Sequence, residues 1–477
     1  MERIKNAELL KKVTTPEAAA SCIKNGMTVA VSGFTVVGYP KVIPAELAKR
    51  ADNGEDLKIT LITGGNVGDE GDGVLSRSHV LARRYGFQNN KDLRTQINSN
   101  EVKFVDTHVG GVPHLIKNGF LGKLDVGIIE IAGTTEDGKL IPCFSAGITN
   151  VIAKYAEKII LEVNETVPLA VEGMHDFIDI DRAPNAQPIL ISSPVSRVGS
   201  PYVTVDFDKV VGIVYSDKRD TNKDLAPANE EQTKIAELLI DFLKDEMKAG
   251  RLSTPLPPMQ SGVGGVANAV LTCLAESDLT DLSVYTEVMQ DAVIALIDSG
   301  KVTEACGTAL TISPSKLDDF YNNIDFYKEK IVLRPQEISN SAEVIRRLGV
   351  IAMNTAIEVD LAGNVNSTHT NGVNLMNGIG GSSDYAKNAG LCVFTTPSTA
   401  KNGTISCIVP HCGHVDHTEH DTQIIITEYG LADLRGLTAY ERAELLIEKC
   451  AHPKFRPMLR EYIENAKKNA TGFHDIL

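Results

Sequence analysis

The chain has 477 residues, of which 43% are hydrophobic and 23% charged, and its formal net charge is −15. A chain of this length is too long for a single hydrophobic core, so we expect at least two domains. The composition is that of an ordinary soluble globular protein. The acidic balance disfavours nucleic acid and anionic membranes as partners, because both require basic surfaces.

Cysteine usage and the N-terminal sequence favour a cytoplasmic location. Eight cysteines are scattered along the chain with no CxxC pair, which is typical of reduced, mostly buried thiols. The first residues are charged and lack an apolar signal core, and no apolar stretch approaches the roughly 20 residues of a membrane span. We therefore expect a soluble cytoplasmic protein.

In the N-terminal half, strand patterns alternate with helix patterns. Residues 27–34 predict a strand that runs into a glycine loop, and a helix follows with Ile43 and Leu47 on one face. Residues 127–133 and 159–163 predict further buried strands. Strands that alternate with helices indicate a parallel sheet.

A polar stretch over residues 216–229 predicts the boundary between two domains, 1–228 and 229–477. It is followed by a strongly amphipathic helix over 230–248, whose apolar stripe comprises Ile235, Leu238, Leu239 and Phe242. Gly250 is expected to end this helix, and the prolines that follow prevent it from resuming.

The C-terminal half repeats patterns of the first half. The matched segments are 27–34 with 259–265, 127–133 with 356–362, and 159–163 with 425–429. We therefore predict an α/β protein of two related, duplicated open domains, each with a mainly parallel sheet.

Glu287 is the most informative single residue. Residues 282–285 predict the end of a buried strand, and 291–302 have helical apolar spacing. Ligands of α/β proteins usually bind outside the carboxyl ends of strands, where a carboxylate can act as a nucleophile on an acyl group. The alternative is that Glu287 is only a helix N-terminal charge or cap.

Five further motifs accompany Glu287 in a fixed order. They are Ser261–Ala269, Arg334–Asn340, Asn364–His369, Met376–Asp384 and Thr427–Gly436. Together they resemble the acetyl-CoA hydrolase/transferase branch of the class I coenzyme A transferases, and especially its succinyl-CoA:acetate members. The resemblance covers nearly the whole chain and implies a CoA-transferase-like fold and a homodimer.

The resemblance also implies site residues. Glu287 is the expected nucleophile, which would form a glutamyl-CoA thioester in a ping-pong reaction. The backbone N–H groups of Val263 and Gly381 are the expected oxyanion donors, and Glu428 is expected to orient the nucleophile. Residues of the family's coenzyme A site would be Asn340, Gly262, Gly264, Gly380 and Gly381.

Each of these residues also has a structural interpretation. Both glycine runs could simply make tight turns. Asn340 could be the N-cap of a helix over 342–348, and Glu428 could pair with Arg435 in a buried strand. Neither glycine run fits a nicotinamide-binding fingerprint.

Four histidines, His411, His414, His417 and His420, recur at three-residue spacing beside Cys412, Asp416 and Glu419. The pattern is similar to a metal site. However, the flanking segments 408–410 and 424–427 suggest a loop between strands, and the resembling family is not metal-dependent. We predict no metal and no dissociable cofactor.

The preferred function is transfer of coenzyme A between small carboxylic acids, with succinyl-CoA and acetate as the first pair. Two other enzymatic alternatives remain, an acetyl-CoA hydrolase and a 4-hydroxybutyrate or butyrate CoA-transferase. A binding module for coenzyme A or sugar phosphates without covalent chemistry is a third. The sequence offers no clear cation for a second carboxylate, and Arg219 is a candidate only by its place in the linker.

Overall fold

The computed structural model describes residues 2–224, 227–262 and 264–469, and the chain folds into two compact units. Unit 1 comprises Met1–Asp224, Tyr285–Asp291 and Glu304–Val344, and unit 2 comprises Leu225–Val284, Ala292–Thr303 and Ile345–Leu477. The first passage between units, at 224 and 225, lies in the predicted linker. Two stretches beyond it, including the one with Glu287, group with unit 1, so the compact units are not two consecutive segments. The division into domains 1–228 and 229–477 stays a prediction.

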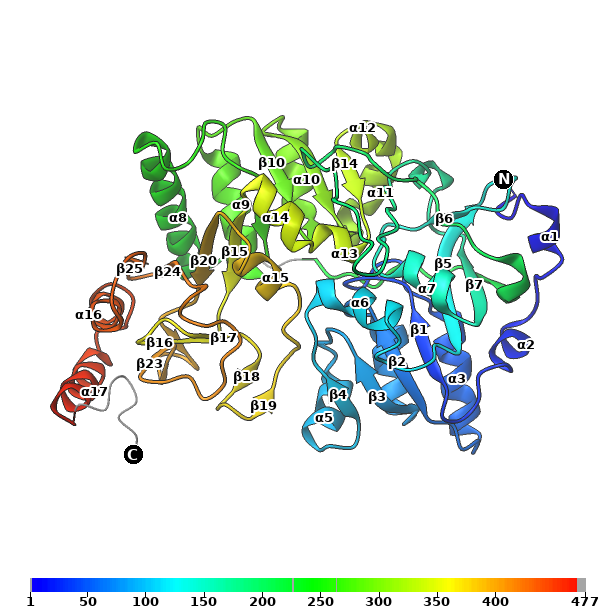
Figure 1. The fold of residues 1–477 in the computed structure, drawn as a ribbon, viewed down its shortest axis with the longest axis horizontal. Coiled ribbons are helices and arrows are strands. Elements are labelled where there is room, and N and C mark those ends of the chain that lie inside the picture. The colour runs from blue at the N-terminus through cyan, green and yellow to red at the C-terminus, as the bar shows by residue number, and fades with distance from the viewer. Residues whose placement is uncertain (1, 225–226, 263, 470–477) are drawn as a thin grey trace. The chain divides into compact units, whose positions relative to one another are not determined.

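Unit 1 is built on an eight-stranded sheet with strand order β4-β3-β2-β1-β5-β7-β8, and β6 pairs with β5 (Figure 1). The strands are β1 (Thr28–Val31), β2 (Ile59–Thr63), β3 (Leu81–Tyr85), β4 (Lys103–Val105), β5 (Val126–Thr134), β6 (Leu140–Pro142), β7 (Lys158–Asn164) and β8 (Val210–Ser216). All pairings along the main path are parallel, as the alternation of strands and helices predicted.

Two short helices precede β1, and the other helices lie between strands of this sheet. The helices are α1 (Ala7–Leu10), α2 (Pro16–Ala20), α3 (Val42–Asp52), η1 (Asp69–Gly73), α4 (Val74–Arg77), α5 (Lys91–Asn98), η2 (Val109–Gly111), α6 (Val112–Lys117), α7 (Thr149–Tyr155), η3 (Leu169–Val171) and η4 (Phe207–Lys209). The predicted helix after β1 is α3, and its residues Ile43 and Leu47 are buried as expected.

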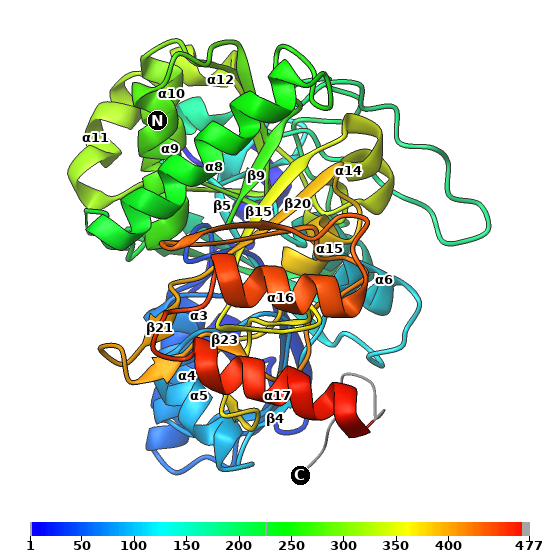
Figure 2. The same ribbon diagram turned by 90° about the vertical axis from the view of Figure 1, so that its left-hand side faces the viewer.

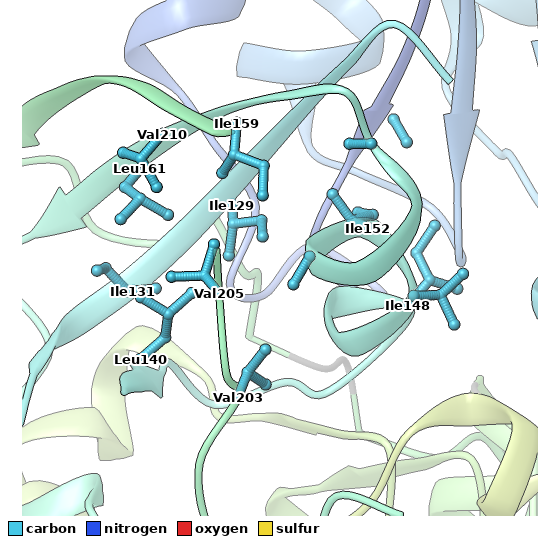
Figure 3. Close-up of a cluster of buried hydrophobic side chains, with 14 of the residues drawn as sticks. Ile129, Ile131, Leu140, Ile148, Ile152, Ile159, Leu161, Val203, Val205 and Val210 are labelled. Carbon is cyan, nitrogen blue, oxygen red and sulfur yellow. The ribbon is translucent and has the colours of Figure 1, made fainter. Parts of the chain in front are cut away.

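The core of unit 1 forms on both faces of this sheet. One cluster includes Ile129, Ile131, Ile152 and Leu161, which Figure 3 shows packed between the strands and α7. Residues of β5 alternate between this cluster and one on the other face, to which Ile128 belongs. Because every residue of β5 is buried, the strand lies in the centre of the sheet.

The later part of unit 1 follows residue 284 in the chain. It contains β11 (Val288–Gln290), β13 (Ala309–Thr311), α11 (Pro314–Asn322), α12 (Ile324–Lys328), β14 (Ile331–Leu333) and α13 (Gln336–Ser339). Strand β11 pairs with β13 in parallel, and β12 (Val302–Gly307) pairs with β14 through residues 305–307.

The first residues of the predicted linker are tied into unit 1. The Asp220 carboxylate lies 2.9 Å from the ammonium of Lys41, which also contacts Glu130 at 2.7 Å. Lys41 and Glu130 are fully buried, so this network needs all its partners to offset the cost of desolvation. Residues 217–224 thus belong to compact unit 1.

Unit 2 contains a second mainly parallel arrangement, with strand order β10-β9-β15-β20-β24-β25. The strands are β9 (Met259–Ser261), β10 (Leu282–Tyr285, of which Tyr285 groups with unit 1), β15 (Ile351–Thr355), β20 (Leu391–Thr395), β24 (Ile424–Thr427) and β25 (Gly430–Asp433). Only the β24–β25 pair of this run is antiparallel among the pairings described.

Helices and short strands complete unit 2. The helices are α8 (Glu230–Lys248), α9 (Gly265–Glu276), α10 (Asp291–Asp298), α14 (Ala342–Leu348), α15 (Ser382–Ala386), α16 (Ala439–Lys449) and α17 (Arg456–Asn469), with the first residue of α10 and the first three of α14 grouped with unit 1. The short strands are β16 (Glu358–Asp360), β17 (Val365–Asn366), β18 (His369–Thr370), β19 (Asn374–Leu375), β21 (Thr399–Ala400), β22 (Ile405–Ser406) and β23 (Ile408–Val409). Figure 2 shows α16 and α17 side by side.

The two strand orders support the predicted duplication but correct two of its matches. The order β2-β1-β5-β7-β8 of the first sheet can be set against the order β10-β9-β15-β20-β24 of the second. Strand β5 then has the same position as β15, and β7 has the same position as β20. The sequence pattern instead matched β5 with 356–362, which contains β16 of a separate three-stranded sheet. It matched β7 with 425–429, which overlaps β24. Short apolar strands resemble one another too closely for pattern alone to distinguish neighbours in a sheet.

Helix α8 has the predicted bounds. Asn229 caps it, with a reciprocal bond from the Asn229 N–H to the Gln232 side chain. Ile235 and Leu239 of the predicted stripe are buried, while Leu238 and Phe242 are half-buried. Over the described part of the chain, the helices all lack the combination of length and apolar character that a membrane span requires.

Candidate active site

Glu287 lies in a bend between β10 and β11. The Thr286 N–H donates to the Cys306 carbonyl at 2.9 Å, and the Glu287 carbonyl accepts from the N–H groups of Thr308 and Ala309 at 2.8 and 3.2 Å. The strand before Glu287 is confirmed, but a short strand separates Glu287 from α10, which ends at Asp298 and not at residue 302. The backbone of Glu287 is thus fixed by strand pairing rather than by a helix start.

The side chain of Glu287 is bound by Asn340. The Asn340 Nδ2 donates to Glu287 Oε2 at 2.8 Å, and the Ser339 hydroxyl donates to Asn340 Oδ1, also at 2.8 Å. Because the amide oxygen accepts from Ser339, the amide nitrogen is the atom that faces the carboxylate. Asn340 is buried at the end of α13. Unit 1 therefore brings two of the predicted site residues into direct contact.

Gly307 permits the close approach of β12 to this segment. A Cβ built on Gly307 would lie 3.2 Å from the Glu287 carbonyl oxygen and 3.2 Å from the Met289 methyl carbon. Both contacts are tighter than side chains ordinarily tolerate, so a larger residue would displace the Glu287 backbone. Gly307 was not predicted from the sequence, since one glycine at a strand end carries no distinctive pattern.

Arg334 anchors the chain where β14 leads into α13. Its side chain is fully buried, with Nε 3.0 Å from an Asp176 oxygen and Nη1 2.9 Å from the Cys306 sulfur. In the sequence, Arg334 is distinguished only as the first residue of the motif Arg334–Asn340. Its partner Asp176 is 158 residues away in the chain, so no local signal could have identified the pair.

The predicted glycine loops belong to unit 2. Gly262 follows β9, and its N–H donates to the Met353 carbonyl at 3.0 Å. Gly264 has φ of 138° and Gly380 has φ of 65°, and both values favour glycine, whereas Gly381 has φ of −99°. Val263 lies outside the described residues. The oxyanion and coenzyme A roles of these positions stay predictions.

Glu428 follows β24 in unit 2 and is half-buried. Its carboxylate accepts from the Ser398 N–H at 2.8 Å and from the Ser398 hydroxyl. The alternative partner considered in the sequence analysis, Arg435, instead forms ion pairs with Asp433 at 2.6 Å and Glu246 at 3.0 Å. The ion-pair interpretation of Glu428 is therefore wrong, and its proposed orienting role stays a prediction.

The histidines of 411–420 lie in the predicted loop between β23 and β24. His417 is buried against the Phe394 ring, with Nε2 3.2 Å from the Ser382 hydroxyl, while His414 contacts Asp416 at 3.2 Å. His411 is 3.8 Å from Asp360. Among the described residues, His, Cys, Asp and Glu side chains form no group of three or more arranged to hold a metal ion. The absence of a metal stays a prediction.

Arg219, the candidate cation for a second carboxylate, forms an exposed ion pair with Asp318 of α11 at 3.1 Å. Exposed pairs of this kind contribute little to stability. Unit 1 thus supplies a half-buried carboxylate, which accepts a hydrogen bond from the buried Asn340 amide, at a bend just after a strand. Such a carboxylate is suited to nucleophilic or acid–base chemistry.

Two family models match this chain, and similar proteins cover nearly all of it. Residues 1–215 match the acetyl-CoA hydrolase/transferase N-terminal domain, and residues 317–463 match the acetyl-CoA hydrolase/transferase C-terminal domain. The chain is 46% identical over 472 residues to a succinyl-CoA:acetate CoA-transferase of Clostridium kluyveri, which covers 99% of this chain and 88% of that protein. It is 43% identical over 479 residues to an acetyl-CoA hydrolase of Schizosaccharomyces pombe, with 98% and 92% covered.

Among solved structures, RipA from Yersinia pestis shares the fold. It matches with a TM-score of 0.72 at 24% sequence identity, over 97% of this chain and 98% of that chain. At this identity the match concerns the fold alone. It agrees with the α/β architecture of mainly parallel sheets described above.

Proposed function

The chain belongs to the acetyl-CoA hydrolase/transferase family and is an enzyme of the CoA-transferase type, and we propose that it exchanges coenzyme A between succinyl-CoA and acetate with Glu287 as nucleophile. The observation that carries this proposal is the 2.8 Å bond from Asn340 to the Glu287 carboxylate. The acid pair is proposed from the 46% identical relative that acts on succinyl-CoA and acetate.

The proposed reaction has two symmetrical halves. Glu287 attacks the thioester carbonyl of succinyl-CoA, which breaks the C–S bond and gives a mixed anhydride and the CoA thiolate. The thiolate then attacks the glutamyl carbonyl, releasing succinate and leaving a glutamyl-CoA thioester. Acetate attacks this thioester and displaces the thiolate again. Attack of the thiolate on the acetyl carbonyl gives acetyl-CoA and restores the Glu287 carboxylate, so the exchange requires no metal or redox cofactor.

Asn340 has a defined part in this chemistry. Its N–H binds one carboxylate oxygen and so orients the carboxyl group for attack, while Ser339 prevents the amide from turning over. Orientation of a reacting group is worth several kcal/mol when the geometry is held closely. We further propose that Val263 and Gly381 stabilise the oxyanion and that Glu428 assists Glu287. The support for these three roles is the family membership.

Trapping the intermediate tests the nucleophile. The protein is incubated with succinyl-CoA and then with borohydride, which reduces a glutamyl thioester to an alcohol. We expect activity to be lost and the changed mass to lie in the peptide that contains Glu287. A matched control is Glu304→Ala, which alters another half-buried glutamate of unit 1 and should still be labelled at Glu287. Labelling at any other residue would exclude Glu287 as the nucleophile.

Hydrolysis is a second candidate function, because a 43% identical relative is an acetyl-CoA hydrolase. In that case water replaces the acceptor acid at the same acyl-glutamyl or thioester intermediate. Release of free thiol from acetyl-CoA, measured with and without succinate, separates the two. For a transferase we expect product formation to depend on succinate and hydrolysis to be much slower. Rapid release of free thiol without succinate would establish a hydrolase, because a transferase passes coenzyme A to succinate and frees no net thiol.

A further inference from the structure

Helix α13 is a single turn that carries Asn340 at its end. An isolated turn of four residues is not stable by itself, since helix nucleation is costly. Its position therefore depends on tertiary contacts, and any error in its position is passed to the bond between Asn340 and Glu287. The contacts of α13 described below join it to other residues of unit 1.

The side chain of Gln336 makes the first of these contacts. It is fully inaccessible, and its Nε2 donates to the Val109 carbonyl at 2.6 Å and to the Gly64 carbonyl at 3.4 Å. Two carbonyls around one amide atom identify that atom as nitrogen. Gln336 thus connects the start of α13 to the loops that follow β2 and β4.

Gly64 makes room for this side chain. A Cβ on Gly64 would lie 2.0 Å from Gln336 Oε1, a distance that no side chain allows. The Gln336 N–H also donates to the Gly147 carbonyl at 3.0 Å, and its carbonyl accepts from the Asn340 N–H at 2.9 Å. The residue therefore contacts the unit 1 loops on one side and the backbone of Asn340 on the other.

Two further bonds hold the same turn. Lys117 and Glu337 form an ion pair at 2.6 Å with both side chains at least nine-tenths buried. The Tyr285 hydroxyl donates to the Ile338 carbonyl at 2.6 Å, and Tyr285 lies two residues before Glu287. The turn and the nucleophile's strand are consequently attached to each other at a second point besides Asn340.

We propose that Gln336 is a positioning residue for the reaction, which acts through Asn340 on the Glu287 carboxylate. This proposal rests on the proposed function of Glu287. Gln336 does not touch the carboxylate in any described contact and takes no part in bond making. It sets where α13 begins, and four residues later the chain places the Asn340 amide. Loss of its two donor bonds would allow the turn to shift, and shifts of about 1 Å in a reacting geometry cost on the order of a hundredfold in rate.

The test compares Gln336→Met with Gln96→Met. Gln96 is a buried glutamine of unit 1 whose Nε2 also donates to a backbone carbonyl, that of Ser76 at 2.8 Å, but it lies on α5 and not on α13. We expect Gln336→Met to lower kcat of exchange by roughly 10- to 100-fold with KM for acyl-CoA changed by less than about threefold. Gln96→Met should leave kcat within about twofold. Equal kcat values for the two variants would refute the proposal.

A double-mutant cycle separates positioning from general damage. In an Asn340→Ala background, Gln336→Met should change kcat by less than about threefold, since its effect passes through the missing amide. If the fold-losses in kcat of the two single variants multiply in the double variant, the proposal is overturned. If Gln336→Met does not fold, Tyr285→Phe serves instead, because it removes only the hydroxyl bonded to α13. Its expected loss of kcat, about three- to tenfold, should also vanish with Asn340→Ala, and persistence of that loss would overturn the proposal.

The cycle distinguishes this inference from the proposed function. Borohydride labelling of Glu287 in the Gln336→Met protein reports whether the nucleophile is correct, whatever the value of kcat. Labelling of Glu287 with no coupling between Gln336 and Asn340 would reject the positioning role alone. Labelling elsewhere would reject the nucleophile itself.

Discussion

Glu287 in unit 1 and Glu428 in unit 2 are both half-buried glutamates that follow a strand, yet they are held differently. Glu428 accepts two bonds from one residue, Ser398, through its N–H and its hydroxyl. Glu287 accepts a hydrogen bond from the Asn340 amide. Asn340 ends a turn that is itself held by a buried ion pair and a buried glutamine. The hydrogen bonds of Glu428 are of a kind found in ordinary loops, whereas the hydrogen bond of Glu287 depends on contacts made by remote parts of unit 1. The difference predicts that activity is more sensitive to changes around Glu287.

The largest effect is expected from Glu287→Ala. Removal of a covalent nucleophile should cost several kcal/mol of barrier, so exchange should fall below about one per cent of the unaltered rate. Steady-state transfer from succinyl-CoA to acetate measures it, with Glu304→Ala as the control. Retention of more than one per cent would remove the distinction drawn between the two glutamates.

Asn340→Ala should have the next largest effect. Loss of one positioned polar group lowers turnover by roughly 10- to 1,000-fold, while the melting temperature should change little. The matched control is Asn164→Ala, because Asn164 is a buried asparagine of unit 1 that donates to the Lys218 carbonyl. A large fall in melting temperature with normal activity of the folded fraction would show that Asn340 is only structural.

Glu428→Ala tests whether the second glutamate of this comparison takes part in the reaction. If Glu428 assists the reaction, its loss should reduce turnover by about tenfold or more, whereas Ser398→Ala should leave turnover nearly unchanged. The two variants share the loss of the same side-chain hydrogen bond. Equal and small effects on activity, with equal losses of melting temperature, would assign Glu428 to the loop alone.

Unit 2 also contains a carboxylate whose effect on stability depends on pH. Hydrogen bonds from Arg251, and then from Arg435, lower the pKa of Glu246 from 4.5 to about 2. A lowered folded-state pKa gives stability that is complete above the unfolded pKa and is lost as the pH falls from about 4.5 towards 2. Glu246→Gln should therefore reduce stability by about 1–2 kcal/mol at pH 7, since Arg251 is largely exposed and the pair is partly screened.

Denaturant unfolding of the Glu246→Gln protein at pH 7, 4 and 3 measures this difference. The gap between the variant and the unaltered protein should narrow as the pH falls. Exchange activity at pH 7 should stay within about twofold under conditions in which both proteins are folded. A gap that widens in acid would contradict the assigned direction of the pKa shift.

The smallest effect is expected from removal of metal ions. Exhaustive chelation should leave exchange unchanged, because the proposed chemistry uses a carboxylate and N–H donors only. Elemental analysis should find well under one metal per chain. Stoichiometric zinc whose removal abolishes activity would instead recast Glu287 as a general base for a metal-bound water.

The sequence was sufficient for features that depend on local spacing. Helix α8 was predicted with its observed bounds because its apolar residues follow the 3.6-residue period and Gly250, which has φ of 69°, follows its end. The strand that ends at Tyr285, the loop between β23 and β24, and the parallel α/β architecture follow from equally local patterns. The ordered motifs were specific enough to predict the family.

Other features were decided only by the tertiary structure. The sequence could not show that Glu428 binds Ser398 rather than Arg435, or that β15 and not β16 occupies the place beside β9. It could not reveal that Gln336 is bonded to carbonyls 227 and 272 residues away. Periodicity reports which face of an element is buried, whereas a buried polar side chain finds its partner only when distant segments pack together. The residue types of the site could therefore be read from the chain, but the bonds that hold Glu287 and Asn340 could not.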